Sequence, residues 1–479
     1  MSRLRFLSQS LAIFSIIALG GCAVGPDYQL PSLNLPLSWL GMEPDKTPKT
    51  VSEELLPSEN KTPWWQDFND PDMTALIERA LANNENLAIA AARIVEVRGL
   101  RESAFGKLFP QIGVGAAADR ENPGVSTTNH IVSFYQGAFD ATWELDLFGG
   151  TRREIEAQSA ATGAAEASYR DASLSLAAEV AREYILLRQL QAQMDVTKQT
   201  ADIQHHLYDI TQDHYKGGLV STLDVAQAET LYKTTSAHIP DFERQITASS
   251  YRLSVLLGEN PGSVQDIVGH AVPIPDVKSL PILEAPANII RRRPDVATAE
   301  RNLAAATALQ GVAISQLYPQ ISISALIGTQ YGIFQLYKYE ATHEIWDLGA
   351  SAAMPILNFG TIEGQINAAD ARQVQALHHY KQTVLQALAD VETDLSNLSK
   401  EIARDDALQS AGKSAEHAVT VAHDRYRNGL TDFTTVLQAE QQRFSVQLDL
   451  IASQSTVAQD IVALHKALGD NPVDAKTDN

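Results

Sequence analysis

The stretch Leu108-Phe109-Pro110-Gln111-Ile112 returns later in the chain as Leu317-Tyr318-Pro319-Gln320-Ile321. The two copies lie 209 residues apart (317 minus 108), and the later pair Phe148-Gly149 and Phe359-Gly360 lies 211 residues apart (359 minus 148). A repeat of this length indicates a duplicated fold and not a short solenoid unit. The sequence therefore predicts two halves that share one plan.

The first residues of the chain have the pattern of a bacterial export signal. Arg3 and Arg5 precede an apolar run from Leu11 to Leu19, and two glycines then lead to Cys22. The run is too short to span a membrane, so residues 1–21 are predicted to be a signal peptide. The small residues before Cys22 resemble the lipobox of bacterial lipoproteins, which implies cleavage before Cys22, its acylation and, with an alanine next, export to the outer membrane. The alternative is a buried free thiol beside an ordinary cleavage site.

Charge and hydropathy limit what the chain can bind or cross. The 479 residues carry a formal net charge of −21. So acidic a chain does not wrap nucleic acid, because that binding depends on neutralised phosphates. Beyond the signal, no apolar run approaches the roughly 20 residues that a membrane helix needs. If this chain crosses a bilayer, it must therefore do so with β-strands closed into a barrel.

Proline-rich stretches divide the chain. Residues 22–65 contain prolines at short intervals and are predicted to be an extended, lipid-anchored arm. A second proline-rich stretch, residues 273–293, is predicted to connect the repeats. Repeat 1 then covers residues 66–272 and repeat 2 covers residues 294–472, with a C-terminal tail at 473–479.

Apolar spacing, prolines and glycines predict the same order of elements in each repeat: helix, β-hairpin, long helix and helix. Repeat 1 has a helix from Asp72 to about Lys107, a hairpin at 110–146, a long helix at 150–214 and a helix at 222–257. Repeat 2 has a helix from Asp295 to Gln316, a hairpin at 319–357, a long helix at 361–426 and a helix at 432–468. At about 1.5 Å per residue each long helix spans roughly 100 Å, which favours a palisade of helices over a compact domain. The alternative is a solitary antiparallel coiled coil, although the Ala-rich helices lack a clean heptad seam.

Both hairpins alternate between apolar and polar residues. Such strands of roughly ten residues are typical of membrane β-barrels. The predicted lipid-facing residues are Tyr135, Phe139, Trp143, Ile321, Ile323 and Trp346. A soluble sheet half-buried on a core is the alternative, because it has the same alternation.

Four strands cannot close a barrel, since the smallest membrane barrels use about eight. Open sheet edges are excluded from lipid, so several copies must share one barrel. A trimer contributes twelve strands, which enclose a ring of roughly 24 Å between backbones. The predicted fold class is therefore a mixed α+β membrane protein, in which a trimeric β-barrel continues into a long α-helical barrel.

Several phrases of the sequence resemble the TolC-like outer membrane factors. They are Trp64-Trp65, Asp70-Pro71, the run from Leu76 to Ala82, Leu108-Phe109-Pro110, Leu256-Leu257-Gly258, and Arg292-Arg293-Pro294-Asp295-Val296 with Ala299-Glu300. Gly25-Pro26-Asp27-Tyr28 after the cysteine is similar to the NodT-type lipoprotein branch, which serves resistance-nodulation-division (RND) efflux systems. The resemblance covers essentially the whole mature chain.

This resemblance implies a homotrimer, lipid-anchored in the outer membrane of a Gram-negative bacterium, with its helical barrel in the periplasm. The implied function is the outer membrane channel of a tripartite efflux pump, which passively conducts small molecules such as drugs and toxic compounds. The implied partners are a periplasmic adaptor protein, an inner membrane RND transporter and outer membrane lipid.

Two turns match the helical tips at which the family's channels are gated. The candidate tip and gate residues are Tyr215, Lys216, Gly217, Gly218, Asp224, Tyr426, Arg427, Gly429 and Asp432. The glycines permit tight reversal and close approach of an adaptor's helical hairpin, and the charged residues are candidates for ion pairs that hold the constriction shut. The alternative is a solvated helix end, where an exposed ion pair contributes about 0 to 1 kcal/mol. Gln438 stands where family members often carry aspartate, which leaves Asp432 or Glu440 as candidates for an acidic ring.

The sequence does not favour an enzyme. The adjacent pairs His205-His206 and His378-His379 lack the spacing of a zinc site and a third ligand. No phosphate loop or nucleophile elbow is present. We therefore predict no catalytic residue, no metal and no cofactor. Two other functions remain open: the exit duct of a type I polypeptide secretion system and, in another class, a pore-less coiled-coil scaffold of the cell envelope.

Overall fold

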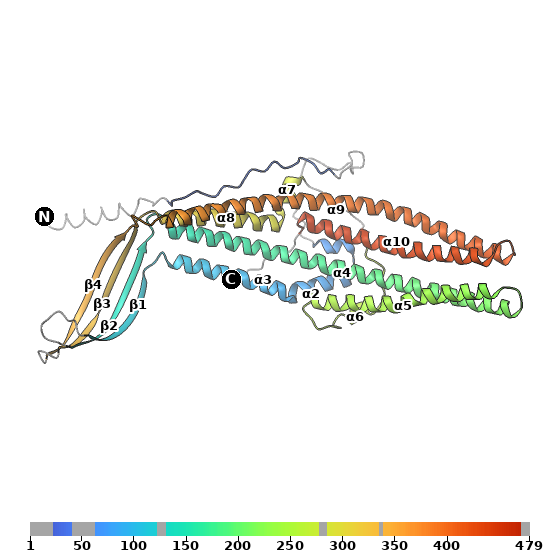
Figure 1. Ribbon diagram of the computed structural model, residues 1–479, viewed down its shortest axis with the longest axis horizontal. Coiled ribbons are helices and arrows are strands. Elements are labelled where there is room, and N and C mark those ends of the chain that lie inside the picture. Colours follow the sequence, from blue (N-terminus) through green and yellow to red (C-terminus); the bar gives the residue numbers. More distant parts are fainter. Residues whose placement is uncertain (1–22, 41–62, 122–130, 277–284, 335–338, 471–479) are drawn as a thin grey trace. The chain divides into compact units, whose positions relative to one another are not determined.

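The computed structural model describes residues 23–40, 63–121, 131–276, 285–334 and 339–470 (Figure 1). The predicted signal peptide, Cys22 and the predicted tail lie outside these residues. The chain divides into two compact units. The first comprises Met1–Ser32, Ala92–Glu166 and Thr298–Gln382, and the second comprises Leu33–Ala91, Ala167–Ala297 and Thr383–Asn479. Each unit takes segments from both predicted repeats, because elements of the two repeats pack against each other.

The first unit contains one antiparallel sheet of four strands in the order β1-β2-β3-β4 (Figure 1). The strands are β1 (Gln111–Glu121), β2 (Val132–Leu145), β3 (Gln320–Phe334) and β4 (Tyr339–Ala353). Each repeat supplies one hairpin, as predicted, and the two hairpins are joined by pairing between β2 and β3. The sheet is therefore a product of both repeats.

Four long helices adjoin this sheet in the sequence. Helix α3 (Glu85–Gly106) precedes β1, α4 (Gly150–Lys216) follows β2, α8 (Pro294–Ser315) precedes β3 and α9 (Thr361–Arg427) follows β4. Because the strands are antiparallel, all four strand–helix junctions lie at the same end of the sheet. The pairs Leu145↔Ile321 and Gln320↔Ala353 mark that end.

The repeated Phe-Gly dipeptide marks equivalent turns at two of these junctions. Gly149 and Gly360 have φ values of 78° and 85°, a left-handed backbone that glycine adopts without steric cost. Their carbonyl oxygens accept the first helical hydrogen bonds of α4 and α9, from the amides of Arg153 and Gly364. The same local structure thus starts both long helices.

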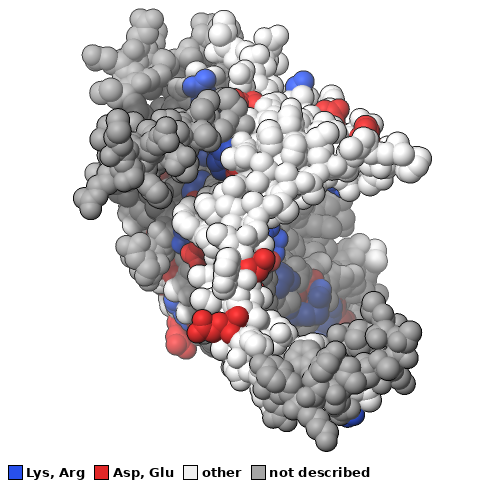
Figure 2. All heavy atoms as spheres, turned by 90° about the vertical axis from the view of Figure 1, so that its left-hand side faces the viewer, with Lys and Arg blue, Asp and Glu red and all other residues white. Residues whose placement is uncertain are grey.

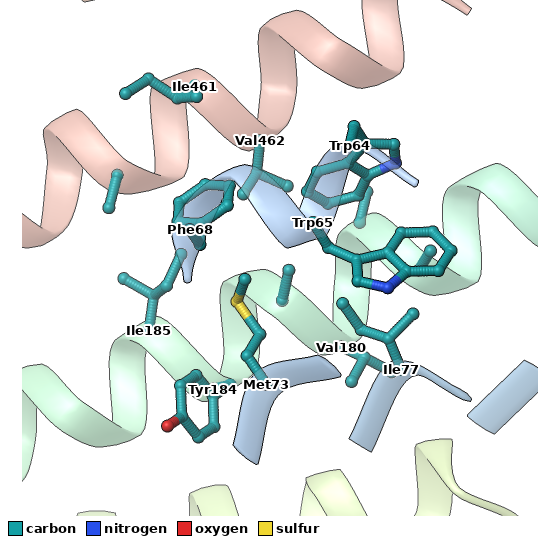
Figure 3. Packing of buried hydrophobic residues seen from close by; sticks show 14 of the residues in the cluster. Trp64, Trp65, Phe68, Met73, Ile77, Val180, Tyr184, Ile185, Ile461 and Val462 are labelled. Atoms are coloured by element: carbon teal, nitrogen blue, oxygen red, sulfur yellow. The ribbon is translucent and has the colours of Figure 1, made fainter. Parts of the chain in front are cut away.

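The second unit contains the core cluster shown in Figure 3. Its remaining elements are η1 (Trp64–Phe68), α2 (Pro71–Asn83), α5 (Thr222–Leu256), α6 (Gln265–Val268), α7 (Pro286–Arg292) and α10 (Phe433–Leu468). Trp64, Trp65 and Phe68 are buried among side chains of α2, α4 and α10 (Figure 3). The Trp-Trp phrase therefore anchors the start of repeat 1 to the helices of both repeats.

The phrase from Arg292 to Val296 joins three helices of the second unit. The Arg293 side chain is almost fully buried at the start of α8. It donates hydrogen bonds to the Ala467 carbonyl of α10 at 2.9 Å and to the Asp390 carboxylate of α9 at 3.1 Å, and it also binds Asp295 at 2.7 Å. The buried guanidinium of Arg293 therefore has hydrogen-bond acceptors for its donors, and the carboxylates of Asp295 and Asp390 balance its positive charge.

Several element boundaries differ from those predicted. The helix predicted from Asp72 to Lys107 is two helices, because Asn84 interrupts it. The side-chain Oδ1 of Asn84 accepts a hydrogen bond from the Leu87 backbone amide at 3.1 Å, and its side-chain Nδ2 donates to the Leu256 carbonyl at 2.8 Å. Helix η1 begins within the predicted arm, and α7 lies within the predicted connector. The other long predicted helices begin and end within two residues of the observed ones.

No helix within the described ranges combines the length and the apolar character that crossing a membrane requires.

Candidate functional site

The sheet has one apolar face, which its register defines. Residues that pair directly across strands share a face, and the row Val114–Phe139–Ile327–Trp346 runs across all four strands. Each of these side chains is more than half exposed, with Trp346 at 77%. The register places all six predicted lipid-facing residues on this face: Tyr135, Phe139, Trp143, Ile321, Ile323 and Trp346.

Some residues of the apolar face were missing from the predicted set. Ile112, Val114, Ile327 and Leu348 belong to it and are exposed. The alternation that identified the other six also includes these four, so the sequence signal was present. Figure 2 is viewed from the side on which Figure 1 draws the strands, and the described surface there is mainly uncharged.

The opposite face of the sheet is polar. Its rows contain Gln111–Thr142–Ser324–Gly349, Gly113–Asp140–Leu326–Asp347 and Ala117–Gln136–Gln330–His343. Asp140 and Asp347 therefore lie at one level of this face. One sheet thus presents one surface suited to an apolar medium and one suited to water.

Strands β2 and β3 approach each other closely at Gly328. A Cβ added to Gly328 would lie 2.3 Å from the Gly137 carbonyl oxygen and 2.6 Å from the Ala138 Cβ. Opposed Cβ atoms on a flat antiparallel pair lie about 4.5–5.5 Å apart. The backbones of β2 and β3 therefore approach unusually closely at this point, which leaves no room for a side chain at position 328.

The two helical hairpins of the second unit end in the same turn. At the end of α4, the Leu219 amide donates to the His214 carbonyl and the Gly218 amide to that of Tyr215, both at 2.9 Å. At the end of α9 the equivalent bonds run from the amides of Leu430 and Gly429. Both glycines have positive φ, so each hairpin ends in a Schellman motif.

The charged candidates at these tips bind within their own hairpins. Lys216 pairs with Asp213 at 2.9 Å, and Asp224 forms a capping box with Ser221 at the start of α5. Asp432 caps α10, where hydrogen bonds from the Thr435 side chain and amide lower the pKa of its carboxyl. Over the described residues, no ion pair joins Asp432 to Arg427. A gating role for these residues stays a prediction.

Tyr426 joins the two tips to each other. Its ring lies 5.4 Å from that of Phe433, in a small cluster that also contains Leu207 of α4 and Ala228 of α5. Burial and the nearby carboxylate of Asp224 raise the pKa of Tyr426. The hairpins of the two repeats are therefore packed together just behind their turns.

Glu440 does not provide an acidic ring at the surface. Its side chain is 1% exposed and lies between two side chains: His423 Nε2 is 3.0 Å from Oε1, and Arg443 Nη2 is 2.8 Å from Oε2. The spacing of Glu440 and Arg443 on one helix indicated their pairing, whereas His423 lies on the preceding helix without any sequence signal. The equivalent Glu229 of repeat 1 is exposed.

The residues after Cys22 lie against the first turn of α4. The Val24 amide donates to the Phe148 carbonyl at 3.1 Å. Arg153, whose side chain is 5% exposed, binds Asp27 at 2.6 Å. No sequence signal linked these residues, because they lie more than 100 positions apart.

One histidine of the adjacent pairs lies against a carboxylate of its own helix. His205 pairs with Asp209 on the same helix, with 3.2 Å between Nδ1 and Oδ2. In the part of the chain that the structure describes, no group of three or more His, Cys, Asp or Glu residues is arranged to hold a metal ion.

A sheet with one apolar and one polar face, continued by long helices, defines one protomer of a membrane channel wall. The model of the family "Outer membrane efflux protein" matches residues 76–259 and 285–470. The chain therefore belongs to the outer membrane efflux protein family, whose members are pore proteins and not enzymes.

Known proteins resemble this chain over nearly its full length. Nodulation protein T of Rhizobium leguminosarum bv. trifolii is 26% identical over 98% of this chain and 99% of its own. The toluene efflux pump outer membrane protein TtgC of Pseudomonas putida is 28% identical over 96% of this chain and 94% of its own. The structure of the outer-membrane channel OprN superposes with a TM-score of 0.86 at 30% identity, over 94% of this chain and 100% of that one. These likenesses confirm the predicted family and the predicted fold class, a trimeric outer membrane channel with two structural repeats.

Proposed function

We propose that this chain is the outer membrane channel of a tripartite efflux pump, in which three copies close their sheets into one barrel. The two free edges of the sheet carry this proposal. Strands β1 and β4 each pair on one side alone within the described residues. Unpaired backbone groups cost several kcal/mol each in lipid, so the edges of one copy need those of another.

Three sheets of four strands make a barrel of twelve, with a ring of roughly 24 Å between backbones. The apolar face with Phe139 and Trp346 contacts lipid, and the polar face with Asp140 and Asp347 lines the pore. A polar pore of this width conducts small solutes passively. The exported compounds are drugs and other toxic small molecules, a class that includes the toluene named in one relative.

The partners of this channel are a periplasmic adaptor and an inner membrane RND transporter. The tips of the two hairpins offer the adaptor a repeated surface, because Leu219 and Leu430 occupy the same position of the Schellman motif and are 74% and 66% exposed. Equivalent apolar side chains at both tips suit the docking of two similar helical hairpins. The helical part of the chain lies in the periplasm in this arrangement.

Acylation of Cys22 anchors the mature chain to the outer membrane. Ala23, the next residue, lies beside Gly149 at the strand–helix junction, since a Cβ on Gly149 would lie 2.5 Å from the Ala23 Cα. Ala23 therefore lies at the end of the sheet where the strands join the helices.

Planar bilayer recording tests the channel function. Purified protein added to a bilayer is expected to give discrete, long-lived conductance steps, and liposomes that contain it are expected to release a trapped dye. A preparation that binds the bilayer without conductance or release would instead support the envelope scaffold. Co-purification with a polypeptide secretion transporter in place of an RND transporter would support the secretion duct.

A further inference from the structure

The second unit contains a cavity of about 970 Å³ between α4, α9, α10 and the start of α8. Over the described residues, six carboxylates line this cavity against three cationic side chains. The carboxylates are those of Asp171, Glu179, Glu183, Asp295, Asp390 and Asp394. Cavities of this volume are typical of small-molecule sites, and the excess of carboxylates favours a cation as the ligand.

The sequence repeat places two of these carboxylates at equivalent positions. Glu183 of α4 and Asp394 of α9 lie 211 residues apart (394 minus 183), which is also the spacing of the repeated Phe-Gly dipeptide. Both side chains line the same cavity. Repeat 1 is therefore an internal reference for the contacts that a carboxylate at this position makes.

In repeat 1 this carboxylate binds a guanidinium. Arg252 of α5 lies against Glu183, with Nε at 2.9 Å and Nη2 at 2.8 Å from Oε1. In repeat 2 the position equivalent to Arg252 is Ala463, again 211 residues later (463 minus 252). Ala463 lines the cavity. The cavity therefore lies where repeat 2 lacks the arginine side chain of repeat 1.

Asp394 has no cation in contact with it. Over the described residues, its carboxylate forms no hydrogen bond and no ion pair. Asp390, one turn earlier on α9, instead accepts from Arg293 at 3.1 Å. Burial, followed by the charges of Asp390 and Asp460, raises the pKa of Asp394 to about 6, against the opposing charges of Arg182 and Arg293. The carboxylate is thus ionised at neutral pH without the guanidinium that its counterpart has.

The three cations of the cavity wall do not fill this place. Arg293 is already bound by two carboxylates. Arg182 and Lys466 form no ion pair within the part of the chain that the structure describes, and they act on the cavity through their charge alone. On the facing helix α4, burial also raises the pKa of Asp171. Asp171 and Asp394 are therefore two carboxylates of the cavity for which burial outweighs the nearby cations.

We propose that this cavity binds a small organic cation with a guanidinium or ammonium group, and that Asp394 binds the cationic group. The ligand takes the place in repeat 2 that the Arg252 side chain takes in repeat 1. A guanidinium suits the carboxylate well, because two of its N–H groups donate at once in a planar pair. This site goes beyond the proposed function, and its test does not depend on conductance.

Binding of phenylguanidinium to the full-length trimer in mild detergent tests the site, measured by isothermal titration at about pH 7.5. Saturable binding is expected, because a charged planar donor meets an ionised carboxylate. Phenylurea has a similar shape without the charge and is expected to bind about tenfold more weakly or less. Equal binding of the two compounds would overturn the inference. Absence of binding, as in a cavity already filled by a side chain of another chain, would also overturn it.

Asp394→Asn removes the charge and keeps the size of the side chain. It is expected to weaken the binding of phenylguanidinium by about tenfold or more. Asp406→Asn is the matched control, because Asp406 is exposed farther along α9 and does not line the cavity. Unchanged binding in Asp394→Asn, or an equal loss in both variants, would contradict the role of Asp394.

Ala463→Arg supplies the side chain that repeat 1 has at the equivalent position. Its guanidinium is expected to bind Asp394 and to weaken the binding of phenylguanidinium by about tenfold or more. Gln454→Arg adds the same charge at an exposed position of α10 and is the control. Undiminished binding in Ala463→Arg would contradict the shared position of ligand and arginine.

The pH dependence of binding tests the site in the unmodified protein. With a pKa of about 6, the Asp394 carboxyl is about one-tenth ionised at about pH 5 and almost fully ionised at about pH 7.5. The affinity for phenylguanidinium, which keeps its charge, is expected to fall about tenfold between these values. Binding that is independent of pH would count against Asp394. Bilayer conductance reports the channel separately, so a failure of the proposed function is distinguishable from a failure of this site.

Discussion

Phe139 of β2 and Ile327 of β3 lie directly opposite each other, and this pair joins the hairpin of one repeat to that of the other. Both side chains are more than 60% exposed on the apolar face. A duplicated sequence thereby builds one continuous surface across four strands. In a water-exposed protein such a surface would be costly, whereas in a bilayer it is the favoured one.

A charge on this surface should impair membrane assembly. Phe139→Arg is expected to cost about 2–4 kcal/mol, because the guanidinium would enter the hydrocarbon region. Gln136→Arg, three positions away on the polar face, is the control and is expected to assemble normally. The measurement is the yield of heat-resistant trimer in isolated outer membranes, and equal yields of the two variants would count against the assignment of the faces.

The close approach of β2 and β3 depends on Gly328. Gly328→Ala is expected to cost about 1–3 kcal/mol through overpacking, because its Cβ would meet the backbone of β2. Gly115→Ala lies in the same cross-strand row, but nothing lies within 4 Å of its Cβ position. Thermal dissociation of the assembled channel should thus occur at a lower temperature for Gly328→Ala alone. If both alanines have the same effect, the close approach of the two strands does not require a glycine.

Replacement of the charged tip residues is expected to make the channel leaky. Asp432→Ala and Arg427→Ala are each expected to raise single-channel conductance by about twofold or more, if the charged tips hold the constriction shut. Asp432→Asn distinguishes charge from structure, because an asparagine retains the N-cap of α10 while removing the charge. Unchanged conductance in both Asp432→Ala and Arg427→Ala would refute gating by these residues.

The raised pKa of Asp394 makes the stability of the folded chain depend on pH. Burial, followed by the charges of Asp390 and Asp460, raises its pKa to about 6, whereas an unfolded aspartate ionises near 4. The folded chain therefore loses stability as pH rises from about 4 through 6, where the unfolded state is already ionised.

Asp394→Asn should remove this loss. Its gain in thermal stability over wild type is expected to be larger near pH 7.5 than near about pH 5. Asp241→Asn is the control with the opposite sign, because hydrogen bonds from Arg244 and Gln245 lower the pKa of Asp241. A gain for Asp394→Asn that is independent of pH would contradict the assigned cause.

The sequence predicted the periodic and repeated features of this fold. The alternation around Tyr135 and Trp346 identified the two faces of the sheet, because a strand has a period of two residues. The glycines Gly218 and Gly429 placed the ends of the long helices. The repeat itself predicted equivalent turns at Gly149 and Gly360.

Features that depend on distant contacts were not predicted. Asn84 lies between two segments of high helix propensity, and its role is visible only with the Leu256 carbonyl that it binds. The burial of Glu440 depends on His423 of the preceding helix. The contact between Arg153 and Asp27 joins residues 126 positions apart, and no local pattern encodes it.

The most direct test of the shared barrel is the native mass of the protein extracted from the outer membrane in mild detergent. The free edges of β1 and β4 predict a particle of three chains that persists on dilution. A stable particle of one chain that still conducts would contradict closure of the barrel by copies of this protein.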